Sequence, residues 1–224
     1  MGSSIAIDGP AGAGKSTIAK AIAKSLKIVY LDTGAMYRAA AYKALQLGID
    51  LLDKTNLASL ADNLKIDVQY KNNEQRIILD GEDITESIRT PEISKAASAV
   101  AAIPEIRLKL VDIQRSIAKK VNVVMDGRDI GTYVLPDASV KIFLTASVEE
   151  RAKRRYDELH NKGINDSYAD ILKDIEERDY KDSTRAFAPL KKAKDAVEID
   201  TTSMSIEEVI ERILQIIDKG MGKC

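Results

Sequence analysis

The stretch IAIDGPAGAGKSTIAKAIA, residues 5–23, decides the fold. It begins with a short apolar run that is typical of a buried strand, and its last part places Ile18 and Ile22 at the four-residue spacing of a helix face. Between them, Gly9 and residues 14–16 fit the pattern GxxxxGKS/T. A strand, a glycine-rich loop and a helix in this order predict a phosphate-binding loop.

The chemistry of this loop predicts a nucleoside triphosphate as ligand. Glycines let the backbone N–H groups wrap the β-phosphate, while the ammonium of Lys15 spans the β- and γ-phosphates. The hydroxyl of Ser16 is placed to ligate Mg²⁺, and that of Thr17 to bond the α-phosphate. The predicted nucleotide-binding residues are Gly9, Pro10, Ala11, Gly12, Ala13, Gly14, Lys15, Ser16 and Thr17.

Composition excludes several classes of partner. The 224 residues hold 34 Lys and Arg against 35 Asp and Glu, and a net charge of −1 offers no bulk attraction to nucleic acid or anionic lipid. No run approaches the ~18 apolar residues of a membrane helix, and the N-terminus lacks a basic segment followed by an apolar one. We expect a cytoplasmic protein that uses neither nucleic acid nor membrane, built as one α/β domain with an insertion.

Cysteine and histidine are too scarce for several kinds of chemistry. Cys224 is the only cysteine, which excludes an internal disulfide and a multi-cysteine metal site. His160 is the only histidine and lies in a polar stretch, where a solvated surface position is expected. Catalytic triads and metal clusters based on histidine would all have to use this one residue.

Short apolar runs alternate with helical patterns along the chain. This alternation predicts a five-stranded parallel sheet with helices on both faces. The expected strands are Ile5 to Ile7, Ile28 to Leu31, Val123 to Met125, Val140 to Leu144 and Ala196 to Ile199. Near the C-terminus, Ser205 and Glu208 have the spacing of a capping box, and we expect the apolar stripe of the helix that follows, from Ile206 to Ile217, to lie in the core.

The regular alternation breaks between about Asn63 and Thr90. There, a stretch of alternating apolar and polar residues (66–70) and a second apolar run (77–79) are followed by turn pairs, at residues 72–73 and 80–81. Thr90 and Pro91 then have the pattern of a helix N-cap and first helical residue. We expect a small antiparallel insert, over residues 63–103, that carries a second substrate site.

Other motifs decide between the classes that share this loop. A guanine-specific GTPase would carry an NKxD base-binding motif, but Asn161 and Lys162 are followed by Gly163 and Ile164, and no DxxG motif occurs. The chain instead places arginines where strands end and helices begin, at Arg38, Arg107, Arg128, Arg151, Arg154, Arg155, Arg178 and Arg185. Two substrates that both carry phosphate would need such a set.

Three segments carry the most telling of these arginines. LDTGAMYR follows the second predicted strand and VVMDGRDIGT contains the third, so both place charged residues where α/β sheets bind ligands. In ERDYKDSTRAFAPL, Arg178, Asp182 and Arg185 are spaced by four and three residues, which sets them on one helical face. A salt-bridged surface helix is the alternative for this last segment.

Taken together, the motifs resemble bacterial cytidylate kinases. The matching segments are GPAGAGKST, LDTGAMYR, DGEDITESIRTPEIS, DGRDIGTYVLPDASVKIFLTAS, ERAKRRYDEL and ERDYKDSTRAFAPL, and the resemblance runs from about Ile5 to Ile217. It implies a monomeric nucleoside monophosphate kinase that transfers phosphoryl from ATP, with Mg²⁺, to CMP or dCMP. It also implies a phosphate-loop core spanning 1–224, an acceptor-binding insert at 63–103 and a mobile helical lid at 151–168.

The resemblance implies roles for individual residues. Arg38 and Arg128 would hold the acceptor phosphate; Ser98, Arg107 and Asp129 would bind cytosine; Arg178, Asp182 and Arg185 would lie near the ribose and phosphate; and Thr33 would line the acceptor site. Arg151, Arg154 and Arg155 begin the lid, from which one or two would reach the triphosphate, with Arg155 as the catalytic candidate beside Lys15 and Arg128.

The chemistry of the acceptor explains why no histidine base is needed. A phosphate monoester has a second pKa near ~6, so its attacking oxygen is already largely ionised at neutral pH. Asp126, at the end of an apolar strand, is the candidate for orienting Mg²⁺-bound water. A kinase for UMP or dTMP is the nearest alternative, and a non-catalytic nucleotide sensor is the alternative from another class.

Overall fold

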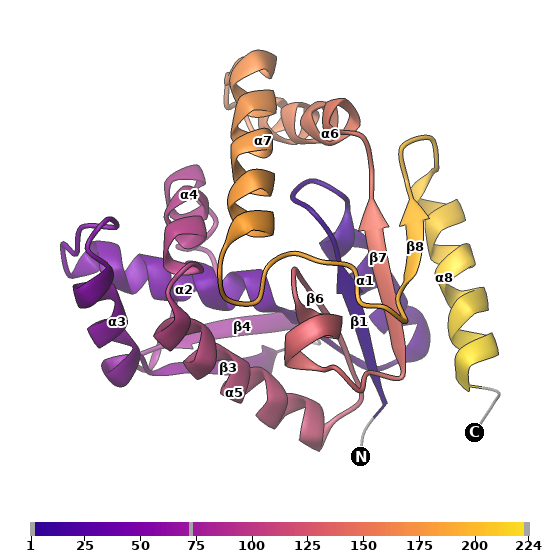
Figure 1. Cartoon of the computed structure of the whole chain (residues 1–224), viewed down its shortest axis with the longest axis horizontal. Helices are drawn as coiled ribbons and strands as arrows, with labels where there is room; N and C mark the ends of the chain where they lie inside the picture. Colours follow the sequence, from indigo (N-terminus) through magenta and orange to yellow (C-terminus); the bar gives the residue numbers. More distant parts are fainter. Residues whose placement is uncertain (1–2, 72–73, 222–224) are drawn as a thin grey trace.

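The computed structural model describes residues 3–71 and 74–221. Its centre is a five-stranded sheet in the order β2-β6-β1-β7-β8, with every neighbouring pair parallel (Figure 1). The strands are β1 (Ser4–Asp8), β2 (Val29–Asp32), β6 (Val123–Gly127), β7 (Val140–Thr145) and β8 (Val197–Asp200). All five predicted strands are therefore confirmed, and β1 lies in the middle, where its carboxyl end opens into the glycine-rich loop.

Helices cover both faces of this sheet, as the sequence predicts. On one face, Ile5 and Ile7 of β1 pack in a hydrophobic cluster with α1 (Lys15–Leu26) and α8 (Ile206–Met221). On the other face, Ala6 packs in a second cluster with α2 (Thr33–Gln46) and α5 (Pro104–Lys120). Successive side chains of a strand point to opposite faces, so the apolar run of β1 supplies both clusters.

Helix starts follow the local signals in the sequence. The Thr90 hydroxyl accepts a hydrogen bond from the Ile93 N–H at the start of α4 (Pro91–Val100), as predicted. Both halves of the predicted capping box before α8 form, between Ser205 and Glu208. One expectation is wrong: Ile206, the first residue of the predicted core stripe, is 51% exposed, because it lies in the first turn before the helix meets the sheet.

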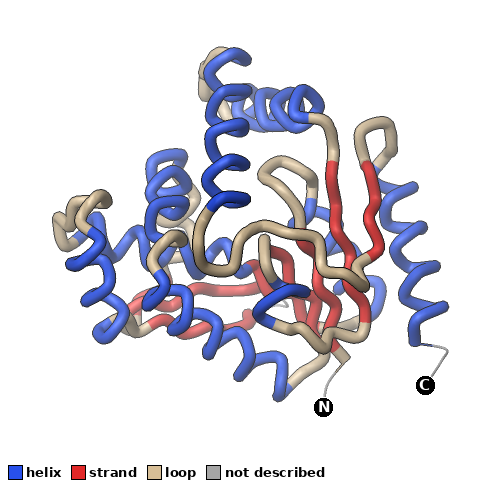
Figure 2. The backbone as a smooth tube through the Cα atoms, viewed as in Figure 1, coloured by secondary structure: helices blue, strands red, loops and turns tan. Residues whose placement is uncertain are grey.

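The insert is a separate three-stranded antiparallel sheet (Figure 2). It consists of β3 (Ile66–Lys71), β4 (Glu74–Leu79) and β5 (Glu82–Asp83), and it follows α3 (Lys54–Asn63). The turn at residues 80–81 is present with positive φ angles, whereas the predicted turn at Asn72 and Asn73 lies outside the described residues. Ile77 and Leu79 are buried in the same cluster as α2, so the insert shares a core with the main domain.

A helical hairpin stands over the carboxyl ends of the central strands, at the top of Figure 1. It consists of α6 (Val148–Asn161) and α7 (Tyr168–Thr184), which pack through a small cluster of Ala152, Leu159, Ile171 and Ile175. The expected lid, residues 151–168, corresponds to most of α6 and the connection to α7. That this hairpin moves stays a prediction.

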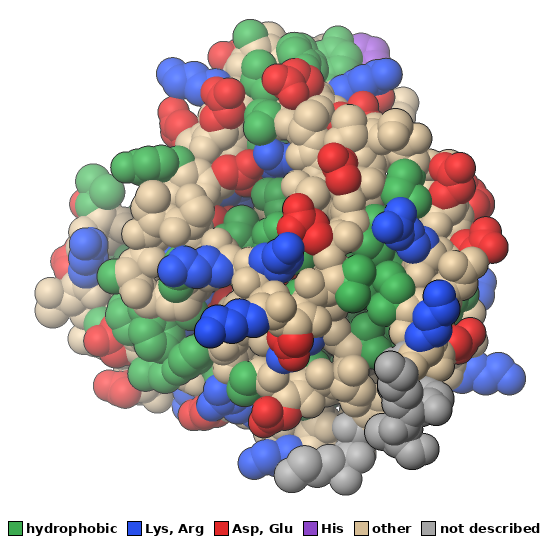
Figure 3. Space-filling view, turned by 45° about the vertical axis from the view of Figure 1, so that its right-hand side comes forward, with side chains coloured by type: hydrophobic (Ala, Val, Ile, Leu, Met, Phe, Trp, Pro, Cys, Tyr) green, Lys and Arg blue, Asp and Glu red, His purple; other side chains and the backbone are tan. Residues whose placement is uncertain are grey.

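The surface carries no large area of one charge on the face that Figure 3 shows, where acidic and basic side chains are interspersed. Among the helices that the structure describes, none combines the length and the apolar character needed to cross a bilayer.

Candidate active site

A cavity of about 890 Å³ lies at the carboxyl ends of the central strands, between the glycine-rich loop, the start of α2, α4, and the α6–α7 hairpin. It gathers nearly all the predicted site residues. Those that line it are Ala11, Gly12, Ala13, Gly14, Lys15, Ser16, Thr17, Thr33, Arg38, Ser98, Arg107, Asp126, Arg128, Asp129, Arg155, Arg178, Asp182 and Arg185. Gly9 and Pro10 lie just behind, at the start of the loop.

The glycine-rich loop requires two of its glycines on steric grounds. Gly9 has a φ of 151°, and a Cβ on it would come 2.0 Å from the carbonyl oxygen of Leu144 in β7. Gly14 has a φ of 81° and caps α1, a left-handed conformation that L side chains rarely adopt. The loop therefore wraps a space at the N-terminus of α1, where the backbone N–H groups and the helix dipole favour an anion.

Lys15 begins α1 and is almost completely buried. Its ammonium donates a hydrogen bond of 2.6 Å to the carbonyl oxygen of Pro10, within the loop that it follows. Burial and the neighbouring Arg128 guanidinium hold the pKa of Lys15 well below its ordinary value. A phosphate in the loop would supply the missing counter-charge and keep this lysine protonated.

Asp126 ends β6 and lies buried beside the loop. Its two carboxylate oxygens accept hydrogen bonds of 2.8 Å from the hydroxyls of Ser16 and Tyr30, and Thr33 donates to its backbone carbonyl at 2.6 Å. Burial and the negative charge of Asp32 raise the pKa of Asp126. A hydroxyl and a carboxylate oxygen next to the phosphate loop are hard ligands of the kind that Mg²⁺ takes, so the residues fit this ion.

Thr33 lines the cavity, but its hydroxyl already has a partner in the protein. It is the first residue of α2 and is buried, and its hydroxyl is engaged with the end of β6. The partner of Asp126 on its other side, Tyr30, was missed in the sequence because it lies inside the apolar run of a strand. In the part of the chain that the structure describes, no group of three or more His, Cys, Asp or Glu side chains lies together as a metal site.

A buried ion pair forms part of the wall of the cavity. Arg107, from α5, is only 1% exposed and donates to Asp129 at 2.5 Å, while its guanidinium stacks 5.2 Å from the ring centre of Tyr37. The Nε of Arg107 and the hydroxyl of Ser98 are buried and have no hydrogen-bond partner among the described residues. Unpaired buried donors are costly, so this part of the cavity is built to bind a polar ligand.

Guanidinium groups crowd the middle of the cavity. Arg38 donates to Asp32 at 3.0 Å, and Arg128 donates to Asp182 of α7 at 2.8 Å. The Nε of Arg178 is buried without a partner among the described residues, and burial together with repulsion from Arg128 lowers its pKa to about 10. Cations held this close together favour an anion between them.

Asp182 and Arg185 lie between these guanidinium groups and the buried ion pair. Arg178 and Asp182 lie on α7 as predicted, but the helix ends at Thr184, so Arg185 is not part of its face. Arg185 nevertheless lies near the same groups, 3.7 Å from Asp182 and 3.6 Å from Asp129. Although burial acts to raise it, the positive charges of Arg128 and Arg178 hold the pKa of Asp182 below its ordinary value.

The three arginines of α6 have different surroundings. Arg151 is buried and binds the loop itself, donating to the carbonyl oxygen of Ala11 at 2.9 Å, and it forms an ion pair with Asp179 at 2.6 Å. Arg154 donates to the backbone and hydroxyl oxygens of Thr201, at 2.7 and 3.1 Å. Arg155 pairs with Glu158 of its own helix at 2.8 Å and leaves 34% of its side chain exposed, so of the three it is the most available to a ligand in the cavity.

One further buried carboxylate holds the turn that follows Asp129. Asp8, the last residue of β1, accepts hydrogen bonds from the N–H groups of Ile130 and Gly131, at 2.8 and 2.7 Å. It thereby fixes the π-helical turn Ile130–Val134 that follows Asp129. Burial raises the pKa of Asp8 to about 6. Its only signal in the sequence is a polar residue that ends an apolar strand.

Comparison with known sequences gives a consistent result over nearly the whole chain. A family model described as cytidylate kinase matches residues 5–219. A cytidylate kinase from a Geobacillus species is 55% identical, with 97% of each chain covered. One from Desulfitobacterium hafniense is 54% identical over 96% of this chain and 92% of its own length.

Comparison with solved structures shows a likeness of fold alone. A gluconokinase from Sinorhizobium meliloti 1021 covers 99% of this chain and 92% of its own, with a TM-score of 0.51 and 15% sequence identity. This similarity agrees with a kinase fold built around a phosphate loop, as the sequence predicts.

Proposed function

The chain belongs to the cytidylate kinase family, and from that premise we propose that it transfers the γ-phosphoryl group of ATP to CMP or dCMP, giving ADP and CDP or dCDP. One observation carries the proposal beyond the family. A single cavity joins the glycine-rich loop, which suits a triphosphate, to a buried polar pocket with unpaired donors, which suits a base.

Cytosine fits the chemistry of the buried pocket. Its exocyclic amine is a donor that the carboxylate of Asp129 accepts, while its ring nitrogen and carbonyl are acceptors for Arg107 and the hydroxyl of Ser98. Uracil presents a carbonyl in place of the amine, so it would set an acceptor against Asp129. The pocket is therefore expected to reject UMP, because two acceptors, the uracil carbonyl oxygen and the carboxylate of Asp129, would face each other without a proton between them.

The acceptor phosphate would lie among the guanidinium groups of Arg38, Arg128 and Arg178. Each of these side chains has a donor that a phosphate oxygen would satisfy, and the phosphate would relieve the repulsion that lowers the pKa of Arg178. Arg185 and Asp182 lie between the phosphate and the base, near the position of the ribose.

Transfer itself depends on position and charge. The loop residues 9–17 hold the ATP phosphates, and Lys15 moves its hydrogen bond from Pro10 to the β- and γ-phosphates. Ser16 is the residue that would hold Mg²⁺, and Asp126, which accepts from its hydroxyl, would orient a water of the ion; when bound, Mg²⁺ would neutralise charge on the phosphates. Arg128 and Arg155 flank the path between the donor and the acceptor and stabilise the migrating group.

No protein side chain is needed as a general base in this scheme. The acceptor oxygen belongs to a phosphate whose second pKa is about 6, so it is largely ionised at neutral pH. The cationic surroundings of Arg38, Arg128 and Arg178 favour this ionised form further. Correct alignment of the two phosphates is then the main contribution of the protein.

The experiment offers the purified protein ATP and Mg²⁺ with CMP, dCMP, UMP, dTMP and AMP in turn, and follows ADP release. We expect kcat/KM for CMP and dCMP to exceed that for UMP by about 100-fold, which lies within the ~1–3 kcal/mol that a buried polar group costs when its hydrogen bond is not made. Equal turnover of CMP and UMP would refute the cytosine assignment. Nucleotide binding without any ADP release would favour the sensor. We also propose that the protein is a monomer and that it is cytoplasmic. Light scattering of the purified protein gives its mass in solution and so tests the oligomeric state.

A further inference from the structure

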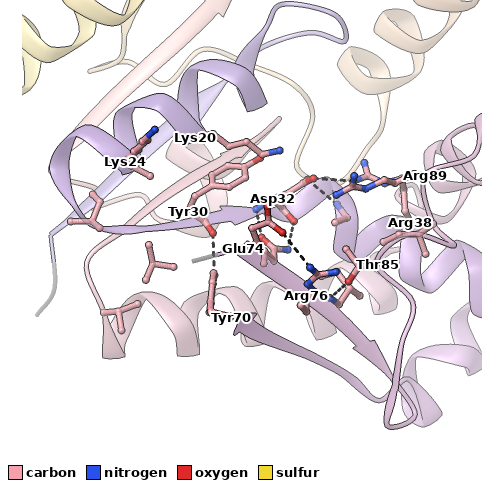
Figure 4. A pocket seen from close by; sticks show the side chains of 18 of the residues that line it. Lys20, Lys24, Tyr30, Asp32, Arg38, Tyr70, Glu74, Arg76, Thr85 and Arg89 are labelled. Carbon is pink, nitrogen blue, oxygen red and sulfur yellow. Dashed lines mark hydrogen bonds and ion pairs between the residues drawn. The ribbon is translucent and has the colours of Figure 1, made fainter. Parts of the chain in front are cut away.

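The strand β2 forms one edge of the central sheet, so its outward polar groups have no neighbouring strand. Side chains of the insert occupy that edge instead. The Tyr70 hydroxyl donates to the carbonyl oxygen of Tyr30 at 3.1 Å (Figure 4). The amide of Gln75 accepts from the N–H of Asp32 at 2.7 Å and donates to its carbonyl oxygen at 3.2 Å. We call Tyr70 and Gln75 the β2 clasp.

Gln75 occupies an unusual position in its own strand. Along β4 it shares a face with Ile77 and Leu79, which are buried at 1% and 4% exposure. Side chains two apart in a strand lie on the same face, so a third apolar residue would be expected there. A polar amide at this position is favourable only if its hydrogen bonds are made, and both of those recorded for it go to the backbone of Asp32.

Asp32 carries the effect of this contact to the cavity. One of its carboxylate oxygens accepts from the N–H of Ala35 at 2.9 Å and so caps α2, and the other accepts from the guanidinium of Arg38 at 3.0 Å. Gln75 fixes the backbone of the residue whose side chain orients Arg38. A shift of this backbone would change both the start of α2 and the direction of the guanidinium.

Close packing does not replace the clasp at this end of the insert. A second cavity, of about 840 Å³, separates Lys20 and Lys24 of α1 from Arg76 of β4 (Figure 4). Because open space lies between these elements, the position of the insert against β2 depends here on directed hydrogen bonds.

We propose that Gln75 is a positioning residue for the acceptor phosphate, acting through Asp32 and Arg38. The inference rests on the proposed function, in which Arg38 holds that phosphate. Gln75 itself does not line the cavity of the active site, so its loss should be felt in the use of CMP and not in the binding of ATP.

The test compares Gln75→Ala with Gln69→Ala, a matched control on the paired strand β3, where the exposed Gln69 bonds only Asp67 among its recorded contacts. For Gln75→Ala we expect the KM for CMP to rise by about tenfold, the size of effect expected when two hydrogen bonds that hold a ligand-binding group are lost. The KM for ATP should stay within about twofold, and Gln69→Ala should match the wild type in both. Gln75→Met, which keeps the length of the side chain without its amide, should reproduce the effect and replaces Gln75→Ala if that variant does not fold.

A double-mutant cycle with Arg38→Lys separates positioning from a general loss of stability. If Gln75 acts through Arg38, the increase in KM for CMP should largely disappear when Gln75 is changed in the Arg38→Lys background. Full additivity, equal changes in both KM values, or a wild-type KM for CMP in Gln75→Met would each overturn the inference. A wild-type protein that fails to phosphorylate CMP would instead refute the proposed function.

Discussion

Arg178 offers a sharp test of how the cavity is built, because its charge is unfavourable in the free protein. The pKa of Arg178 falls from its ordinary value to about 10, first because burial removes water from the guanidinium and then because Arg128 repels it. At about 1.4 kcal/mol per unit, this shift corresponds to roughly 3 kcal/mol. A base whose folded pKa is depressed destabilises the fold wherever it is protonated, so the whole cost is present at neutral pH.

Arg178→Met removes this charge and keeps the unbranched stem of the side chain, which suits the helix α7. We expect the free energy of unfolding of the free protein to increase by about 1 to 3 kcal/mol. The gain is smaller than the full cost of the charge because the attraction between Arg178 and Asp182 is also lost. For a chain of this size the midpoint of thermal unfolding would rise by about 3 to 9 °C. At the same time kcat/KM for CMP should fall by about 100-fold or more, because one of the cations around the acceptor phosphate is missing.

Thermal unfolding with and without CMP, together with steady-state kinetics, measures both effects. Lys173→Met is the control, since Lys173 is an exposed cation on the same helix, and it should change stability by no more than about 0.5 kcal/mol. CMP should stabilise the wild type more than Arg178→Met. The reasoning is refuted if Arg178→Met unfolds at a lower temperature than the wild type in the absence of nucleotide.

Three more expectations follow from the site. Asp129→Asn should reduce the preference for CMP over UMP by about tenfold to 100-fold in competition kinetics, because a neutral amide no longer demands a donor from the base and weakens the pair with Arg107. The pKa of Asp8 in the folded protein is about 6 against an ordinary 3.8, so the folded state keeps this proton up to a higher pH than the unfolded state. The free energy of unfolding should therefore fall by up to about 3 kcal/mol as the pH rises from 4 to 6. In denaturant titrations at a series of pH values, Asp8→Asn should lack this decrease in the free energy of unfolding. Gly9→Ala should lose ATP binding and about 2 kcal/mol or more of stability by calorimetry, since its Cβ would lie 2.0 Å from the Leu144 carbonyl oxygen.

Features that depend on local sequence could be predicted from it. The five strands, the glycine-rich loop and the helix starts at Thr90 and Ser205 all follow from apolar runs and capping patterns a few residues long. The acceptor residues are predicted in another way, through a resemblance to a family whose motifs are distributed over the chain. The cavity then brings Arg38, Arg107 and Arg128 together from three separate elements.

Pairings between distant segments could not be predicted in this way. Spacing puts Arg151 and Arg155 on the same helix, but it does not show that Arg151 binds the Ala11 carbonyl while Arg155 binds Glu158. Nothing in the sequence singles out Gln75, because it is a polar residue that precedes the apolar run 77–79 of its strand. Such contacts depend on how two elements pack, and the sequence of either element alone contains no sign of the partner.

The balance of charge around the acceptor explains why the arginines are accompanied by carboxylates. Arginines alone would repel one another and lose their positions in the free protein, whereas an equal number of carboxylates would leave nothing to attract a phosphate. The acceptor side of the cavity holds five arginines, Arg38, Arg107, Arg128, Arg178 and Arg185, and three aspartates, Asp32, Asp129 and Asp182. Among these groups the positive charges outnumber the negative ones, which favours the phosphate monoester, whose charge at neutral pH is about −1.5 to −2. The aspartates hold guanidinium groups in place in the free protein, and the excess of positive charge attracts the phosphate.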